Sequence, residues 1–452
     1  NQHTDYILGE IYKGNHDIVG FSCYIWNISQ ILEIAQNLKK INPRQIIILG
    51  GPEVSFDSIE LMENEKYIDY IISGEGEKTL KELLGYLIDG GDDIDQLKGV
   101  TYRKKGMVLK NKSRDFINQL DTIPSPFDEE IRFDKNKIIY YESSRGCPYN
   151  CSYCISSTFK GVRFFSLDRV KEDLSILLDK RVKQVKFIDR TFNADKKHSI
   201  SIMKYISERD NGYTNFHFEM VGDRIDDEML QFLSGVREGL FQFEIGVQTT
   251  YNKSSESIDR NVDFKRLSHV VKTISSFKNI HLHLDLIAGL PHESFDRFFD
   301  SFDDVYRLRP QKLQLGFLKL LKGSKIRKEK NKYNYIFQNH PPYEVLGNDA
   351  IQYAELLKLK GIEGILEKYY NSGYFQNAME YLLANFYESP FECYKDIAGF
   401  WESEGHHHVF HSRNALYKNI LDFYIQKGFY GRKLFEEILK LDYLMYQKGS
   451  LP

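Results

Sequence analysis

Three cysteines placed close together constrain this chain more than any other feature. Cys147, Cys151 and Cys154 follow the spacing C-x3-C-x2-C inside the stretch IIYYESSRGCPYNCSYCISST, residues 138–158. Three thiolates on one short loop can hold iron, and a cube of four irons then keeps one iron without a protein ligand. Because iron–sulfur sites normally use four cysteines, this spacing predicts a [4Fe-4S] cluster whose open iron can bind a substrate or cofactor.

Other uses of these cysteines agree less well with the sequence. A structural zinc site needs four ligands, usually as two spaced pairs, and the remaining cysteines, Cys23 and Cys393, stand alone. A disulfide framework is not expected in a chain of 452 residues that has 5 Cys and no secretory signal. Cys393 is expected to be a buried hydrophobic residue, with a hydrogen-atom donor as the alternative.

The composition is that of an ordinary globular protein. A net charge of -3 gives no electrostatic reason to expect nucleic acid or an anionic membrane as the main partner. Nothing approaches the run of about 20 apolar residues that spans a bilayer. The N-terminal residues NQHTDYILGE resemble neither a signal nor a transit peptide, and an oxygen-sensitive cluster suits a reducing compartment. A cytoplasmic location is therefore expected.

Residues 1–90 alternate strand and helix patterns. Such alternation predicts an α/β fold with a parallel, doubly wound, Rossmann-like sheet, which binds ligands just past the strand ends. The expected strands cover 17–22, 45–49 and 67–72, with helices at 28–40 and up to Ile88, and with turns at Gly50-Gly51-Pro52 and Gly74-Glu75-Gly76-Glu77. A tight turn is the simpler explanation of the glycine spacing taken alone.

Residues 91–137 are interpreted as a connector between domains. The runs 100–103 and 107–110, separated by Lys104-Lys105-Gly106, predict a hairpin. Ile123-Pro124-Ser125-Pro126 then predicts a stiff, extended linker, so a domain boundary is expected near Pro126.

From residue 138 to about 325 the alternation of strands and helices becomes more regular. Six strand–helix units fit a partial (β/α)6 barrel, which is an open relative of the eight-fold form. The expected strands lie at 138–143, 185–188, 216–221, 241–247, 280–288 and 313–318, and helices are expected at 166–180, 196–208, 226–235, 264–277 and 294–307.

Polar residues at the ends of these strands are the candidate site residues, because chemistry in parallel βα barrels occurs at that end. Asp189 and Arg190 close the second strand, and Glu219 lies inside the third, where a carboxylate is costly unless it has a partner. Glu244 and Gln248 mark the fourth strand, and a carboxylate beside an amide would suit the hydroxyls of a ribose. Taken singly, each of these residues could equally be a structural ion pair.

The last part of the chain, 326–452, predicts a helical cap that covers the open side of the barrel and shapes the substrate pocket. Helices rich in Tyr, Phe and Leu are expected over 349–370, 375–387, 390–401 and 416–446. His406-His407-His408 with His411 lack a carboxylate and a regular helical spacing, so a metal site is not favoured there. Arg413 and these histidines could instead meet an anionic group of the substrate.

The cysteine triad, with the aromatic Tyr153 directly before the third cysteine, resembles the signature of the radical SAM superfamily. The resemblance implies that the open iron is chelated by S-adenosylmethionine and that electron transfer splits it to methionine and a 5′-deoxyadenosyl radical. It also implies a partial barrel, in agreement with the six strands. By the same resemblance, the segment of Asp189 and Arg190 binds the methionine amino group and Arg260 pairs with the SAM carboxylate. The turn Asp285-Leu286-Ile287-Ala288-Gly289-Leu290-Pro291 resembles the family's adenine-contacting turn, which makes Gly289 and Pro291 candidates for cofactor binding.

The first segment resembles the cobalamin-binding-type domain that often precedes this barrel, with its turns at Gly50-Gly51-Pro52 and at residues 74–77. The Asp-x-His-x-x-Gly motif that supplies a histidine ligand to cobalt is absent, and His3 and His16 lie in the wrong context. The sequence therefore slightly favours a domain that keeps the fold without cobalamin.

Three functions follow from this resemblance. The first is a lyase that abstracts hydrogen from its substrate, with release of queuine from queuosine 5′-phosphate as the specific expectation, because the domain order resembles a clostridial-type subgroup that includes the queuine lyase of queuosine salvage. The alternative is a cobalamin-dependent radical SAM methyltransferase. A non-catalytic scaffold is the third, and the intact cysteine triad disfavours it. The expected partners are a small-molecule substrate and an electron donor such as flavodoxin or ferredoxin.

Overall fold

The computed structural model describes residues 3–91, 93–128, 130, 132–134, 137–158 and 161–446. The chain divides into two compact units. Unit 1 comprises Asn1–Pro124, Lys319–Lys328 and Phe337–Glu344, and unit 2 comprises Ser125–Leu318, Glu329–Ile336 and Val345–Pro452. Each unit is described by itself.

Unit 1 is built on a five-stranded sheet with the strand order β1-β2-β3-β4-β5. The first three strands are parallel, and β4 and β5 continue the sheet antiparallel. The strands are β1 (Ile18–Ser22), β2 (Ile46–Gly50), β3 (Tyr70–Ile72), β4 (Val100–Lys104) and β5 (Met107–Lys110). The helices are α1 (Thr4–Gly14), α2 (Ile28–Ile41), α3 (Pro52–Ser55), α4 (Ser58–Asn64), α5 (Gly76–Asp89) and α12 (Lys325–Lys328).

Two features of unit 1 differ from the sequence-based interpretation. The hairpin expected in the connector is formed, but it pairs with β3 and so extends the first sheet. Two short segments that follow the last barrel strand, 319–328 and 337–344, also belong to unit 1. Neither assignment has a local sequence signal, because both depend on contacts between residues far apart in the chain.

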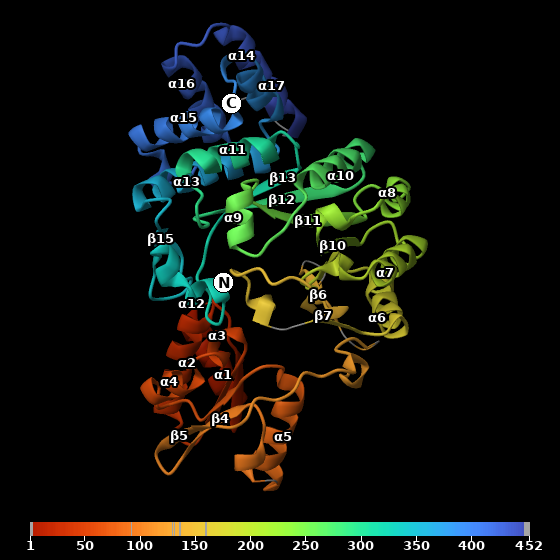
Figure 1. Ribbon diagram of the computed structural model, residues 1–452, viewed down its shortest axis with the longest axis vertical. Coiled ribbons are helices and arrows are strands. Elements are labelled where there is room, and N and C mark those ends of the chain that lie inside the picture. The colour runs from red at the N-terminus through yellow and green to blue at the C-terminus, as the bar shows by residue number, and fades with distance from the viewer. Residues whose placement is uncertain are drawn as a thin grey trace. The chain divides into compact units, whose positions relative to one another are not determined.

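Unit 2 contains the barrel sheet, whose six strands run in the order β13-β12-β11-β10-β9-β6 and are all parallel. The strands are β6 (Ile139–Tyr141), β9 (Gln184–Phe187), β10 (Asn215–Met220), β11 (Phe241–Gln248), β12 (His281–Ala288) and β13 (Lys312–Phe317). The helices of the barrel are α6 (Leu167–Asp179), α7 (Lys196–Glu208), α8 (Asp227–Ser234), α9 (Asn252–Ser257), α10 (Phe264–Phe277) and α11 (Phe295–Tyr306). Helices α6, α7, α8 and α10 flank this sheet in Figure 1. The expected succession of six strands and their helices is confirmed.

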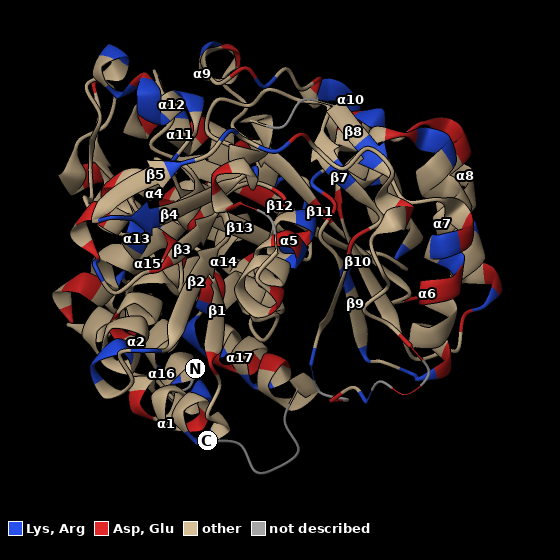
Figure 2. Cartoon of the chain, turned by 90° about the horizontal axis from the view of Figure 1, so that it is seen from below, with Lys and Arg blue, Asp and Glu red and all other residues tan. Residues whose placement is uncertain are grey.

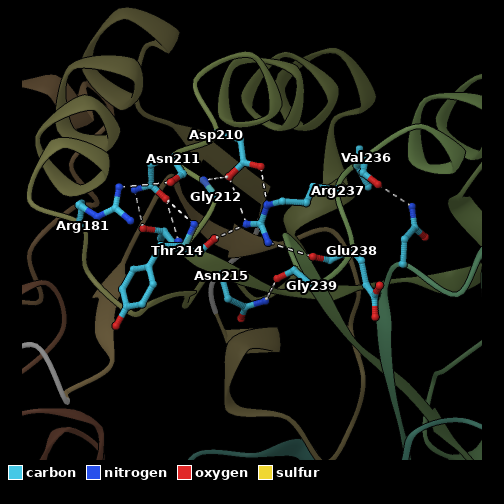
Figure 3. Close-up of polar contacts among 12 residues, drawn as sticks. Arg181, Asp210, Asn211, Gly212, Thr214, Asn215, Val236, Arg237, Glu238 and Gly239 are labelled. Carbon is cyan, nitrogen blue, oxygen red and sulfur yellow. Dashed lines mark hydrogen bonds and ion pairs between the residues drawn. The ribbon is translucent and has the colours of Figure 1, made fainter.

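The loops at the amino ends of the barrel strands are held by a dense polar network (Figure 3). Arg237 donates to both oxygens of Asp210, at 2.5 and 3.1 Å, and to the carbonyl of Thr214 at 3.2 Å. The amide of Asn211 donates to the Leu178 carbonyl at 2.8 Å and thereby ties two helix–strand loops together. This end of a βα barrel serves stability, and here its polar groups are paired with one another.

The C-terminal part of unit 2 is helical, as the composition predicts. It consists of α13 (Tyr353–Leu366), α14 (Gln376–Phe386), α15 (Pro390–Ser403), α16 (Arg413–Gln426) and α17 (Arg432–Tyr446), with the short strand β15 (Val345–Gly347) before them. Strand β14 (Ile336–Phe337) lies where the chain passes from unit 2 to unit 1. The single helix expected over 416–446 is wrong, because the chain turns between α16 and α17 at Gly428 and Gly431, whose φ angles are 68° and 78°. Such positive values suit glycine and stop a helix.

Helix α15 attaches this helical part to the barrel. The carboxylate of Asp303 on α11 accepts a hydrogen bond of 2.8 Å from the Phe391 amide at the start of α15, where an acceptor satisfies an otherwise unpaired helix N–H. The Phe391 ring packs edge-on against Phe299 and Phe302 of α11. The cap is therefore anchored on a barrel helix.

Charged residues of both signs are mixed on the outer helices of the barrel, for example on α6, α7 and α8 (Figure 2). The strands β9 and β10 beside these helices show little charge in the same view. Among the residues that the structure describes, no helix has the length and apolar character to cross a membrane.

Candidate active site

The cysteine loop is carried by a β-hairpin. Strand β7 (Ser144–Cys147) pairs antiparallel with β8 (Gly161–Phe164). Gly146 has a φ of 100°, and a Cβ at this position would lie 2.0 Å from the Gly161 carbonyl oxygen, so only glycine allows the two strands to approach. The hairpin thereby fixes Cys147 at the end of a strand.

All three cysteines of the triad line one cavity of about 250 Å³ in unit 2. The cavity lies at the carboxyl ends of the barrel strands, where the fold predicts chemistry. Its other lining residues are Tyr149, Tyr153, Ser157, Arg190, Thr191, Glu219, Met220, Val221, Glu244, Gly246, Gln248, Arg260 and Asp285. The structure thus brings most of the predicted site residues together.

The donor set fits an iron–sulfur cluster. The thiols of Cys147, Cys151 and Cys154 are free and converge on the cavity from one loop, and thiolates are the ligands that such clusters use. The Sγ of Cys147 lies 3.4 Å from the Thr191 hydroxyl, and Arg260 donates to the Sγ of Cys151 at 3.6 Å. Polar donors beside cluster sulfurs are one means by which proteins tune such centres.

A β-bulge shapes the cavity wall on β11. The register between β11 and β12 shifts between Gly246 and Gln248, and Gln248 takes a φ of 72°. Arg260 donates to the Gly246 carbonyl at 2.5 Å. A Cβ on residue 246 would lie 2.1 Å from the Gln248 amide nitrogen, so the glycine makes room for these side chains.

Two buried polar atoms at the cavity, Oε1 of Gln248 and Nε of Arg260, have no hydrogen-bond partner among the described residues. Oδ1 of Asp285, in the same wall, lies 3.1 Å from Nε2 of His283. Buried polar groups are nearly always paired in native proteins, so unpaired atoms in a cavity wall mark positions where a ligand can supply the partner.

Two carboxyl groups in the wall, Glu219 and Glu244, lie opposite each other in the register of β10 and β11 and have different proton affinities. Burial, with the nearby Glu244 carboxylate as the second cause, raises the pKa of Glu219 to about 7. The imidazole of His217, whose Nε2 lies 3.0 Å from Glu244, and the Lys186 ammonium at 3.1 Å hold the pKa of Glu244 at about 2. The cavity can therefore present one carboxyl that carries a proton near neutral pH and one that does not.

Asp189, Gly289 and Pro291 do not line the cavity, in contrast to the expectation from resemblance. Asp189 is 1% exposed, and its carboxylate accepts hydrogen bonds from the Ser143 amide and from the hydroxyls of Ser143 and Ser144. It therefore holds the base of the cysteine hairpin. The Gly289 carbonyl accepts from Tyr335 and Asn348, and the Pro291 carbonyl accepts from Ser254. The role of both turn residues in cofactor binding stays a prediction.

Several residues at the site were missed by sequence reasoning. Lys186 and His217 lie behind Glu244, and Tyr149, Ser157 and Thr191 line the cavity. A signal for the first two was available, because the segments VKFI, FHFEMV and FQFEIGV alternate apolar and polar residues. Strands buried on both faces normally show continuous apolar runs, so this alternation indicates a polar inner face.

The cap does not contribute to the cavity, because none of the lining residues comes from 326–452. Its histidines make structural contacts: the Nε2 atoms of His407 and His411 lie 3.2 and 2.8 Å from the carbonyls of Ala398 and His406. The expectation that the cap shapes the substrate pocket stays a prediction.

Comparison with protein families divides the chain into three segments. Residues 1–84 match the B12 binding domain, residues 141–305 match the radical SAM superfamily, and residues 331–452 match a family described as a protein of unknown function, DUF4080. The first two matches agree with the Rossmann-like sheet and the six-stranded barrel.

Relatives of this chain are found among proteins of known sequence or structure. The chain is 30% identical to an uncharacterized methyltransferase of Pyrococcus horikoshii over 63% of this chain and 62% of that protein. It is 26% identical to the cobalamin-dependent radical SAM methyltransferase TokK of Streptomyces tokunonensis over 64% and 44% of the two chains. The chain thus spans less than two thirds of the length of these relatives. The cobalamin-dependent S-adenosylmethionine radical enzyme OxsB has the same fold, with a TM-score of 0.66 over 98% of this chain and 72% of that one, at 15% identity.

The cysteine triad in its cavity, the barrel and the sequence matches agree on the class of protein. Residues 141–305 form a radical SAM domain, and the preceding residues 1–84 form a domain of the B12-binding type. A radical SAM domain implies a [4Fe-4S] cluster and S-adenosylmethionine as cofactors.

Proposed function

We propose that this protein is a cobalamin-dependent radical SAM methyltransferase. The observation that carries the proposal is the match of residues 1–84 to the B12 binding domain, ahead of the radical SAM match at 141–305. The two sequence relatives named above are methyltransferases. These relatives favour the methyltransferase alternative over release of queuine, which none of them supports.

The ligand edge of unit 1 offers features that suit a flat macrocycle such as cobalamin. The loops after β1 and β2 are joined by a 2.7 Å hydrogen bond from the Cys23 amide to the Gly50 carbonyl. Gly51 has a φ of 107°, and a Cβ there would lie 2.6 Å from the Cys23 carbonyl oxygen. Beside them, Trp26 is 76% exposed and stacks on Tyr24 at 4.5 Å, which presents a broad aromatic surface.

The loops that follow β1, β2 and β3 contain no histidine. A bound corrin would therefore find no imidazole ligand for its cobalt in these loops. In the sequence analysis this missing histidine argued against cobalamin. It bears on which group ligates the cobalt and does not exclude that cobalamin binds, since the B12 family match extends across these loops.

The barrel residues have separate tasks in this proposal. Cys147, Cys151 and Cys154 hold the cluster, which supplies, when bound, the electron that cleaves S-adenosylmethionine. Arg190 and Arg260 are the cations of the cavity wall, and they suit the carboxylate of the methionine moiety. Gln248, Glu219 and Glu244 offer the donors and acceptors that a ribose diol needs.

Product analysis of S-adenosylmethionine under anaerobic, reducing conditions tests the proposal. The reconstituted enzyme is incubated with and without cobalamin, and S-adenosylhomocysteine, 5′-deoxyadenosine and methionine are quantified. S-adenosylhomocysteine that forms only with cobalamin is expected. Formation of 5′-deoxyadenosine and methionine that is indifferent to cobalamin would overturn the proposal and return a lyase to first place.

The partners are part of the same proposal. We expect a small-molecule substrate, and we expect a low-potential electron donor such as flavodoxin or ferredoxin, because reductive cleavage needs one electron for each turnover. Replacement of the chemical reductant by reduced flavodoxin should sustain S-adenosylmethionine cleavage.

A further inference from the structure

The chain returns to unit 1 after the last barrel strand, and this returning segment consists of residues 319–328 and 337–344. Its two parts are joined to each other: the Leu320 amide donates to the Tyr343 carbonyl at 3.0 Å, and Lys319 and Glu344 form an antiparallel bridge. The guanidinium of Arg327 donates to the Leu320 carbonyl at 2.7 Å and lies 4.5 Å above the Tyr343 ring. The returning segment is thus a folded element of unit 1.

Glu53 is the point at which the returning segment meets the loop after β2. This glutamate is 5% exposed, and its carboxylate accepts a hydrogen bond from the Tyr343 hydroxyl. The Lys322 ammonium lies 3.4 Å from the same carboxylate and 2.7 Å from Asp57. A buried carboxylate is costly without such partners, and the two partners lie 269 and 290 positions later in the chain.

The loop that Glu53 anchors is the one at the ligand edge of the sheet. Glu53 is separated from Gly51 only by Pro52. The Glu53 amide donates to the Cys23 carbonyl at 3.2 Å, so Glu53 also contacts the loop after β1. Gly323 of the returning segment leaves room for the Phe56 ring, since a Cβ there would lie 2.3 Å from it. The position of both loops therefore depends on the returning segment.

We propose that the returning segment is a structural part of the cobalamin-binding edge, in which Lys322 and Tyr343 hold the Gly51–Glu53 turn through the Glu53 carboxylate. Lys322, Tyr343 and Glu53 are positioning residues, because they fix the turn and do not themselves need to touch the corrin. This inference rests on the proposed function, since it requires that unit 1 binds cobalamin. It places residues outside the segment that matches the B12 binding domain, 1–84, in control of that site.

Cobalamin binding to the full chain tests the inference without any measurement of turnover. Aquacobalamin is titrated into the purified protein, and binding is followed by the quenching of tryptophan fluorescence. The chain has 2 tryptophans: Trp26 is exposed beside the loops in question, and Trp401 is 1% exposed in unit 2. A Trp26→Phe variant identifies the signal, and the absorbance of bound corrin provides a second readout.

Lys322→Met is expected to weaken aquacobalamin binding by about tenfold or more, because it leaves the Glu53 carboxylate buried without its cation. Tyr343→Phe removes the hydroxyl donor and keeps the ring beneath Arg327, so a smaller loss is expected. Tyr12→Phe is the matched control, because Tyr12 is 60% exposed on α1 of the same unit and its variant should bind as the wild type does.

A rescue experiment separates positioning from general destabilisation. In the Lys322→Met background, Glu53→Gln removes the uncompensated charge and keeps an acceptor for Tyr343, so most of the lost affinity should return. The inference would be overturned if the loss of aquacobalamin affinity merely paralleled the drop in melting temperature among the variants and Glu53→Gln did not restore binding.

The two proposals fail in different ways. A wild-type chain that binds no aquacobalamin contradicts the proposed function. A wild type that binds, together with Lys322→Met and Tyr343→Phe variants that bind equally well, contradicts the role of the returning segment alone.

Discussion

The two ends of the barrel each contain a half-buried or buried arginine, and the two arginines differ in what surrounds them. Arg237, at the amino end, uses Nε, Nη1 and Nη2 in hydrogen bonds to Asp210, to Thr214 and to the Glu238 carbonyl. Arg260, at the carboxyl end, donates to a thiol and to one carbonyl, and its Nε has no partner among the described residues. One network is complete within the protein and the other is not.

This difference teaches how one barrel divides stability from chemistry. A paired network lowers the free energy of the folded chain by itself, whereas a network with unpaired donors is completed only by a ligand. The same contrast holds for the carboxylates, since Asp210 is neutralised by Arg237 while Glu219 has a pKa raised to about 7. Substitutions at the two ends should therefore have opposite signatures.

The largest effect is expected from removal of the triad. Replacement of Cys147, Cys151 and Cys154 by Ala should abolish the brown iron–sulfur chromophore and all cleavage of S-adenosylmethionine, because no thiolate remains on the loop. The absorbance of the iron–sulfur charge-transfer bands measures the first loss, and product analysis measures the second. Cys393→Ala, in the core of the cap, is the control and should keep the chromophore. Cleavage of S-adenosylmethionine by the triple variant would contradict the assignment of these cysteines as the cluster ligands.

Exchange of the two arginines for methionine sharpens the comparison most directly. Arg260→Met should weaken S-adenosylmethionine binding by about a hundredfold, since charge-assisted hydrogen bonds contribute on the order of 3 kcal/mol. Its effect on the melting temperature should be small. Arg237→Met should instead lower the free energy of unfolding by about 1–3 kcal/mol and leave cofactor affinity unchanged. Equilibrium dialysis measures the affinity for S-adenosylmethionine, and thermal unfolding measures the stability. Equal losses of affinity in both variants would contradict the proposed difference between the two ends of the barrel.

A methyl group added at Gly246 should have an intermediate effect. Gly246→Ala places a Cβ against the Gln248 amide and near Arg260, so both side chains must move and affinity for S-adenosylmethionine should fall by about tenfold. Gly235→Ala at the other end of the barrel meets only one ordinary contact, at 3.8 Å, and should bind normally. The assay is the same dialysis, and unchanged binding in Gly246→Ala would show that the bulge does not shape the site.

The smallest expected effect concerns pH. Burial raises the pKa of Glu219 from 4.5 to about 7 in the folded protein, so ionisation costs stability once the pH exceeds both values and costs nothing below 4.5. Glu219→Gln in the cluster-free protein should therefore increase the free energy of unfolding by about 1–3 kcal/mol at pH 8 and have little effect at pH 4.5. Denaturant titrations at the two pH values measure this, and a gain that is independent of pH would contradict the assigned shift.

Much of the barrel followed from local patterns in the sequence. The six strands and their helices could be located because the hydrophobic pattern of each strand or helix lies within a run of only about 4–15 residues. The observed elements agree with the predicted ones within a few residues. The cysteine triad could also be predicted from the sequence, since its three ligands lie on one loop and their spacing indicates an iron–sulfur cluster. Glu219, Glu244, Gln248 and Arg260 were found because strand ends in a parallel barrel share one edge.

The remaining part of the site was decided by the tertiary structure. Asp189 and Arg190 are neighbours in the sequence, yet the first holds Ser143 and Ser144 and the second faces the cavity. Sequence alone cannot separate such neighbours, because the choice depends on which hydrogen-bond donors a distant segment brings.

The sequence by itself determined the order of elements and the ligands of the cluster, since both are written in short-range spacing. Only the tertiary structure placed the hairpin of residues 100–110 and the returning segment in unit 1, and only it put Lys186 and His217 behind Glu244. The physical reason is that these arrangements join residues between 20 and 300 positions apart, and the free energy that selects them comes from burial and charge pairing in the folded chain.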